Sequence, residues 1–193
     1  MIWDYARLTL ARVATPHQAL ATQLRRLPGV VGQFAPQLGW ANNEAAVLLR
    51  RRENEAPSAM AAPGLITCAE VQPLSATLRP SVDAAPRAGG IYVHRWFEVD
   101  ADAADEFVQL SGQGWERFED QFDTQIFGLF RAAPSAADRG AGLVRLLLLT
   151  RYADHGVWQA SRDPTSEAMR LFQRRAQLTR RSWAASTTLI AGR

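Results

Sequence analysis

The sequence predicts an α+β protein of two tandem ferredoxin-like (βαββαβ) halves whose antiparallel sheets pack face to face as an α/β barrel. Three observations predict this fold: similarity between the two halves of the chain, alternation of strand-like and helix-like segments, and one strand that is apolar on both faces. We expect the halves to be residues 1–84 and 85–193, joined by the proline- and glycine-bearing segment Arg79–Gly90.

The similarity between the halves rests on three pairs of segments, and repeats are examined first because they set the architecture. "IWDYARLTL" from Ile2 resembles "IYVHRWFEV" from Ile91, and "QLGWA" from Gln37 parallels "IFGLF" from Ile126. "VLLRRREN" from Val47 parallels "LLLTRYAD" from Leu147. The offset grows before the last pair because the second half carries "AAPSAADRGAG", which we expect to be an exposed hairpin insertion.

In the first half, a helix is predicted to begin at Pro16, with Thr15 as N-cap and Gln18 completing a capping box. Leucines then recur at helical spacing until Pro28-Gly29. After Glu55 the prolines Pro57, Pro63 and Pro73 disfavour a long second helix. We therefore expect that helix to be short or degenerate, and Leu74–Leu78 to supply the last strand.

In the second half, Asp102 is predicted to cap a helix whose apolar positions keep a period near 3.6, namely Phe107, Leu110, Trp115, Phe118 and Phe122. Asp163-Pro164 is predicted to open a further helix with Met169, Phe172 and Ala176 as its buried stripe. The closing "RSWAASTTLIAG" is apolar and β-branched, which is typical of a strand.

The strand Leu143–Tyr152 is predicted to be buried on both faces. Val144, Leu146 and Leu148 point one way, and Leu147 and Leu149 point the other. One face meets the helices, and the other is most simply buried against the sheet of the companion half. The partner sheet lies within the chain, so homodimerisation is not required, although a homo-oligomer stays open.

The basic residues reflect composition more than a binding patch. The net charge is +3, and all 22 basic residues are arginine. Arginines crowd the last helix and its end (Arg170, Arg174, Arg175, Arg180, Arg181), where they either complement the helix dipole or form a nucleic-acid stripe. No interleaved aromatic motif accompanies them, so we expect no nucleic-acid partner. Arg50–Arg52 are interpreted as strand-end charges that discourage edge pairing.

Cys68 is the only cysteine, which excludes an intrachain disulfide and a thiolate metal cluster. We expect a cytoplasmic protein without a signal peptide, a membrane span or a membrane partner. The three histidines are not spaced as a metal site, and the sequence contains no phosphate-binding glycine loop, nucleophile elbow, HExxH or CxxC. No metal and no cofactor are predicted.

The second half resembles the NIPSNAP family of dimeric α/β-barrel proteins. The resemblance rests on "GIYVHRWFEVDADAADEFVQL", "GLF" and "LLLLTRYADHGVWQASRDP". It implies a small cavity between sheet and helices, with Arg95 and Phe97 in the places of the family's strand arginine and aromatic residue. Tyr152, Asp154, Trp158 and Arg162 fall in the later motif. In the first half Ala6 and Arg52 stand at the arginine and tyrosine places, so a pocket there is expected to be altered or lost.

The candidate ligand-binding residues are Arg95, Phe97, Tyr152, Trp158 and Arg151. A guanidinium beside aromatic rings suits a carboxylate or enolate, although Arg95 could instead pair with Glu98, Asp154 or a helix carboxylate. Arg151 and Tyr152 face opposite sides of their strand, and we expect Tyr152 to enter the cavity.

His94 faces away from Arg95 and is interpreted as a buried histidine bonded to a neighbour. The six tryptophans line a cavity for a flat ligand or simply belong to the core.

Three functions stay open. The first is a protein that binds a small anionic or aromatic molecule in a cavity of the second half. The second is a cofactor-independent monooxygenase or isomerase-like enzyme of the same superfamily, and the third is a non-catalytic assembly protein with a filled barrel. A cavity of several hundred Å³ with Arg95 reaching into it favours the first, whereas solid packing favours the third.

Overall fold

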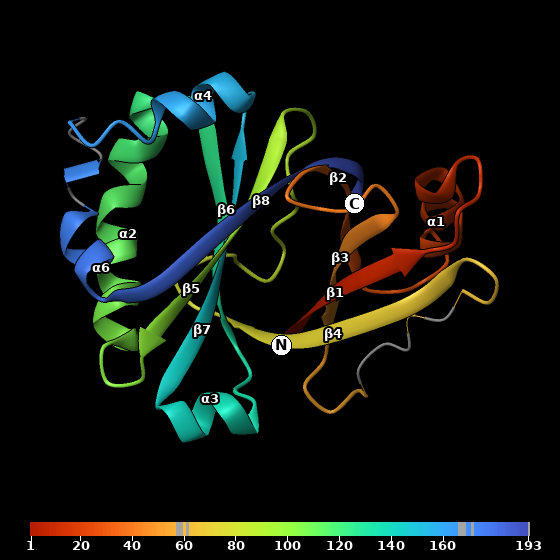
Figure 1. The fold of residues 1–193 in the computed structure, drawn as a ribbon, viewed down its shortest axis with the longest axis horizontal. Helices are drawn as coiled ribbons and strands as arrows, with labels where there is room; N and C mark the ends of the chain where they lie inside the picture. The colour runs from red at the N-terminus through yellow and green to blue at the C-terminus, as the bar shows by residue number, and fades with distance from the viewer. Residues whose placement is uncertain (57–59, 61, 166–168, 171, 193) are drawn as a thin grey trace.

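The computed structural model describes residues 1–56, 60, 62–165, 169–170 and 172–192. Eight antiparallel strands form a closed barrel in the order β1-β3-β2-β8-β5-β7-β6-β4 (Figure 1). The first half contains β1 (Ile2–Leu10), α1 (Pro16–Leu24), β2 (Val30–Leu38), β3 (Glu44–Arg51) and β4 (Ile66–Ala76). The second half contains β5 (Ile91–Asp100), α2 (Ala104–Gln121), β6 (Thr124–Ala132), α3 (Ala136–Ala141), β7 (Leu143–Tyr152), α4 (His155–Ala160), α6 (Gln173–Gln177) and β8 (Thr179–Gly192).

The predicted fold class is confirmed, because each half has the same ferredoxin-like strand order. The order is β4-β1-β3-β2 in the first half and β8-β5-β7-β6 in the second. The two sheets join at two seams, and the seams are unequal. β2 pairs with β8 from Gly32 to Leu38, whereas β4 pairs with β6 only from Leu74 to Ala76.

Both faces of β7 are buried, as its sequence pattern predicts. Leu147 and Leu149 lie in the cluster inside the barrel with Trp3 and Phe130. Leu146 and Leu148 lie on the outer face against α2. Figure 1 shows α2 and α6 on one side of the barrel and α1 on the opposite side, so each half has its own helical cover.

Close packing of α2 explains a glycine within its amphipathic pattern. A Cβ atom at Gly114 would overlap the ring of Phe172. The glycine therefore lets the segment before α6 approach the helix, which outweighs the low helix propensity of this residue.

Two capping predictions are wrong. α1 begins at Pro16, but Thr15 makes no side-chain cap and has a ψ of 65° instead of the extended N-cap conformation. The N-cap of α2 is Ala103 and not Asp102, and no side chain caps this helix. The predicted hairpin insertion is confirmed, because residues 133–142 are largely exposed and connect the antiparallel strands β6 and β7. It contains the short helix α3, which a capping box between Ser135 and Asp138 stabilises.

β4 begins at Ile66, eight positions before the expected start at Leu74. Pro73 fits within the strand because its carbonyl accepts from the Ala133 N–H on the β6 side, so its missing N–H also faces that side. β6 pairing begins only at Leu74, and the ladder to β1 therefore loses no hydrogen bond.

The strand registers correct two of the sequence matches. Arg51 lies opposite Ile2 as Tyr152 lies opposite Ile91, so Arg51 and not Arg52 occupies the position of the tyrosine. Gly39 follows β2, whereas Gly128 lies within β6. The glycine of β2 that corresponds to Gly128 is Gly32, since both lie at a register shift against the neighbouring strand.

The predicted helix after Asp163-Pro164 falls partly on residues 166–168 and 171, which lie outside the described residues. Phe172 is buried as expected, but Ala176 is exposed and Arg175 is buried. No helix in the described part of the chain is long and apolar enough to cross a membrane.

Candidate functional site

Two cavities lie on opposite faces of β5. His94 and Trp96 line a cavity inside the barrel, whereas Arg95 lines a cavity on the outer face, beneath the helices. Because successive side chains of a strand alternate between faces, these neighbours serve different spaces. We name the two spaces the barrel cavity and the helix-face cavity.

The helix-face cavity has a volume of about 50 Å³. One water needs about 10–15 Å³ by this kind of measure, so the space fits a group the size of a few waters. Its lining residues come from β5, β6, β7, α2, α6 and the segments between α4 and α6: Arg95, Trp115, Phe118, Ile126, Leu148, Thr150, Tyr152, Ser161, Arg162, Met169, Phe172 and Arg175.

Two arginines dominate the chemistry of the helix-face cavity. Arg175 is only 9% exposed, and its guanidinium lies 4.1 Å from the ring centroid of Phe172. Its Nη1 donates to the Ser111 hydroxyl at 3.4 Å. Among the residues that the structure describes, no carboxylate lies within ion-pairing distance of Arg95 or Arg175.

The pKa values reflect this shared burial. Burial lowers the pKa of Arg95, and burial together with the charge of Arg95 lowers the pKa of Arg175 to about 9. Burial raises the pKa of the Tyr152 hydroxyl, and the charge of Arg95 opposes that shift. Both arginines therefore stay charged at neutral pH, and Tyr152 stays a neutral hydrogen-bond donor.

The structure brings together two of the five sequence-predicted residues. Arg95 and Tyr152 line the helix-face cavity. Phe97 packs behind it against Phe107, at 4.9 Å between ring centroids, and Trp158 packs against the same core without lining the cavity. Arg151 points to the other face of β7, where it forms an ion pair with Asp123 at 2.8 Å and donates to the Gly89 carbonyl.

Arg175 is the lining residue that the sequence interpretation missed. It was grouped with the exposed arginines of the last helix, although it follows Phe172 by three positions. Residues three apart share a helix face, so the spacing from Phe172 was the signal that could have found it.

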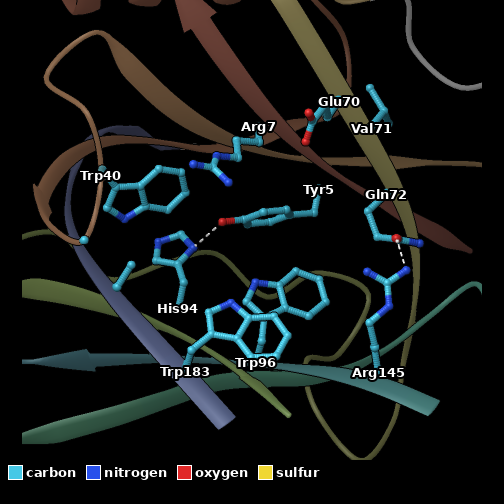
Figure 2. A pocket seen from close by; sticks show the side chains of 12 residues that line it. Tyr5, Arg7, Trp40, Glu70, Val71, Gln72, His94, Trp96, Arg145 and Trp183 are labelled. Atoms are coloured by element: carbon cyan, nitrogen blue, oxygen red, sulfur yellow. Dashed lines mark hydrogen bonds between the residues drawn. The ribbon is translucent and has the colours of Figure 1, made fainter. Parts of the chain in front are cut away.

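The barrel cavity is larger, at about 310 Å³ (Figure 2). Cross-strand pairs from both halves line it. Arg7 opposite Glu70 and Tyr5 opposite Gln72 come from the first half, and Trp96 opposite Trp183 and His94 opposite Ala185 come from the second. Gly39, Trp40, Val71 and Arg145 complete the lining.

A buried hydrogen-bonded chain lies at one side of the barrel cavity. The Tyr5 hydroxyl lies 2.9 Å from His94 Nδ1, and His94 Nε2 lies 2.8 Å from the Thr187 hydroxyl. Burial lowers the pKa of His94 to about 3 and raises that of Tyr5. His94 is therefore neutral at physiological pH, in agreement with its interpretation as a buried histidine bonded to neighbours. The described residues contain no group of three or more His, Cys, Asp or Glu that could hold a metal ion.

Comparison with solved structures shows the fold. A "putative monooxygenase" from Fusobacterium nucleatum is 9% identical with a TM-score of 0.61, over 98% of this chain and 92% of that one. An anthrone oxidase-like protein is 12% identical with a TM-score of 0.60, over 100% and 92%. A "putative chlorite dismutase" is 10% identical with a TM-score of 0.53, over 98% and 95%. These likenesses show the fold, a ferredoxin-like α/β barrel.

A scan against protein-family models gives no match, and a search of curated proteins gives none. The NIPSNAP resemblance therefore stays a prediction.

Proposed function

We propose that this protein binds a small carboxylate, or an anion of similar size, in the helix-face cavity. Arg95 and Arg175 are its charged ligands, and Tyr152 donates a hydrogen bond. One observation carries the proposal: the buried guanidinium of Arg175 and the half-buried guanidinium of Arg95 share a cavity with aromatic walls, and no carboxylate of the described residues neutralises either of them.

The energetics favour an anion in this space. A buried charge without a partner costs several kcal/mol, and the two like charges also repel each other. A bound carboxylate would offset both costs, because a guanidinium donates two parallel hydrogen bonds to it. The volume of about 50 Å³ suits the carboxylate group itself and not a large aromatic ligand. The exposed Arg162 adds positive charge at the rim.

The remaining predicted residues take supporting roles in this proposal. Phe97 and Trp158 form the apolar wall behind the arginines, and Arg151 fixes the linker to β7 through Gly89. The site belongs to the unit 85–193, which the NIPSNAP resemblance covers. We attribute the two units 1–84 and 85–193 to an internal duplication, and the repeated strand order supports this origin.

An enzyme of the monooxygenase or isomerase kind is the second candidate. The same arginines could stabilise the oxygen of an enolate, whose charge resembles that of a carboxylate. The fold shared with the Fusobacterium protein and the anthrone oxidase-like protein agrees with such a role. Arg95 lines the cavity of about 50 Å³ and not one of several hundred Å³, so the expected combination of a large cavity with Arg95 is not met. The separate barrel cavity of about 310 Å³ weighs against the third function, a filled barrel.

Calorimetric titration with acetate, against chloride at matched ionic strength, tests the proposal. We expect saturable binding of acetate that weakens at least about tenfold in Arg95→Met and in Arg175→Met, since each removes charge-assisted hydrogen bonds. Arg174→Gln is the matched control, because Arg174 is the exposed neighbour of Arg175 and pairs with Glu106 at 2.9 Å.

Equal acetate affinity in Arg95→Met, Arg175→Met and Arg174→Gln would overturn the proposal. Absence of saturable binding in the unaltered protein would overturn it as well.

A further inference from the structure

The geometry points to a second, independent binding site: the barrel cavity binds a flat one- or two-ring aromatic molecule that carries a hydroxyl group, such as a phenol or naphthol. Its volume of about 310 Å³ lies at the lower end of the range for small-molecule sites. The helix-face cavity is on the other side of the sheet, so neither site depends on the other.

The aromatic preference comes from two tryptophans on neighbouring strands. Trp96 of β5 lies opposite Trp183 of β8, and their rings stack with centroids 6.3 Å apart at 14°. Trp183 is 39% exposed, which is unusual for so large an apolar side chain. Exposed aromatic surface beside a cavity is typical of a site that a ligand covers.

The hydroxyl preference comes from the direction of the buried hydrogen bonds. The Thr187 hydroxyl has one proton and lies 3.3 Å from the Tyr92 carbonyl, which can only accept, and 2.8 Å from His94 Nε2. We assign the tautomer in which Thr187 donates to the carbonyl, His94 Nε2–H donates to Thr187, and Nδ1 accepts from the Tyr5 hydroxyl. In this tautomer the Tyr5 oxygen has only acceptor capacity left for a ligand.

Figure 2 shows the Tyr5 side chain reaching toward His94, below Arg7 and above Trp96 and Trp183. A ligand whose ring packs on the two tryptophans can therefore direct a hydroxyl to the Tyr5 oxygen. The arginine side of the cavity is less available, since Glu44 already holds Arg7 through bonds of 2.6 and 3.0 Å. A hydrogen-bond donor on the ligand is thus better matched than an anionic group.

The cavity joins the two halves, because Tyr5 and His94 lie at equivalent positions of β1 and β5, in the central strands of the two sheets. Tyr5 lies opposite Leu48 and His94 opposite Leu149, each three positions from the first paired residue. A ligand there would contact both sheets.

A pair of matched ligands tests the inference. Calorimetric titration with 2-naphthol and with 2-methoxynaphthalene compares the same ring system with and without the donor. We expect 2-naphthol to bind about fivefold to tenfold more tightly, the worth of one neutral hydrogen bond. Tyr5→Phe should remove this preference. Trp183→Ala, at a position that is 39% exposed, should weaken binding of both ligands about tenfold.

Tyr152→Phe is the control, because it alters only the opposite face of the sheet. The inference fails if neither ligand binds, if the two bind equally to the unaltered protein, or if Trp183→Ala leaves both affinities unchanged. Acetate binding is measured in the same samples, and its presence or absence judges the proposed function separately.

Discussion

The outer faces of the two sheets carry buried arginines in different ways. In the first half Arg51, at the position of Tyr152, forms an ion pair with the fully buried Asp4 at 2.7 Å. Ala6 occupies the position of Arg95 and lies in an apolar cluster with Leu8 and Leu20 beneath α1. In the second half Arg95 and Arg175 lie under the helices without such a carboxylate among the described residues. The first half neutralises its buried charge internally, whereas the second leaves charge for a ligand.

This difference predicts that the buried arginine of the first half stabilises the fold, whereas the arginines of the second half bind a ligand. An internal ion pair leaves no net charge for a ligand to neutralise, but it is costly to break. A pair of like charges costs stability in the absence of a ligand and favours binding of an anion. The same fold therefore has a structural arginine in one half and ligand-binding arginines in the other, and four predictions examine how the two halves differ.

Asp4→Ala should have the largest effect. It leaves Arg51 buried without its carboxylate, and removal of one partner of a buried pair costs about 3–5 kcal/mol. Denaturant unfolding of the variant should show this loss in the free energy of unfolding. The double variant Asp4→Leu with Arg51→Met should recover most of it. If Asp4→Ala costs less than about 1 kcal/mol, the pair does not stabilise the first half.

The equivalent interior positions Tyr5 and His94 sharpen the comparison, because only His94 titrates in the acid range. The pKa of His94 is about 3 in the folded chain, against an ordinary value of 6.5. Between these values the unfolded chain binds a proton that the folded chain does not. The free energy of unfolding should therefore fall as the pH falls from 6.5 to 3, by up to about 1.4 kcal/mol per pH unit from this group.

Carboxylates titrate in the same range, so the measured quantity is the difference between the unaltered protein and His94→Gln. The variant should show the shallower dependence of unfolding free energy on pH. Parallel curves for the two proteins would mean that His94 binds a proton as readily in the folded state as in the unfolded state.

A substitution at Gly114 tests how closely α2 packs against Phe172 in the second half. Gly114→Ala places a Cβ atom in the ring of Phe172, and overpacking of this kind costs about 1–3 kcal/mol. Gly140→Ala in α3 is the matched control, because a Cβ there has nothing within 4 Å. The control should be stabilised by up to about 1 kcal/mol, the usual gain in helix propensity. Thermal unfolding of both variants measures the contrast, and equal shifts would contradict it.

The sequence was informative where the signal is local. Alternation along β7 correctly places Leu147 and Leu149 on the face opposite to Leu146 and Leu148, and the repeat predicts two sheets that bury each other. The partners of individual side chains could not be predicted in the same way. The Asp4–Arg51 pair joins residues 47 apart and the Tyr5–His94 bond joins residues 89 apart. Neither has a local pattern, so the sequence predicts Arg51 only as a strand-end charge and does not locate the cavity that the tryptophans line.

The candidate site was predicted only in part for a similar reason. Arg95 and Tyr152 follow from strand alternation, which has a fixed period of two. The last helix has only five residues in α6, so its periodicity did not distinguish a buried Ala176 from a buried Arg175. In so short a helix, packing against α2 determines which side chains are buried, and the periodicity of the sequence does not.

Arg95→Met should have the smallest effect on stability, and its sign is the sharpest contrast between the halves. Replacing a half-buried guanidinium that has no carboxylate partner among the described residues by an apolar chain of similar length should stabilise the protein by about 1 kcal/mol in buffer without small carboxylates. Arg51→Met, the same substitution in the first half, should destabilise it by about 3–5 kcal/mol because Asp4 is left alone. Denaturant unfolding of both variants, with and without acetate, decides the matter. Without acetate, we expect the two variants to change the free energy of unfolding in opposite directions. We expect acetate to stabilise Arg51→Met but not Arg95→Met. Equal destabilisation would mean that Arg95 has a structural partner as Arg51 has, and the two halves would then treat their buried arginines alike.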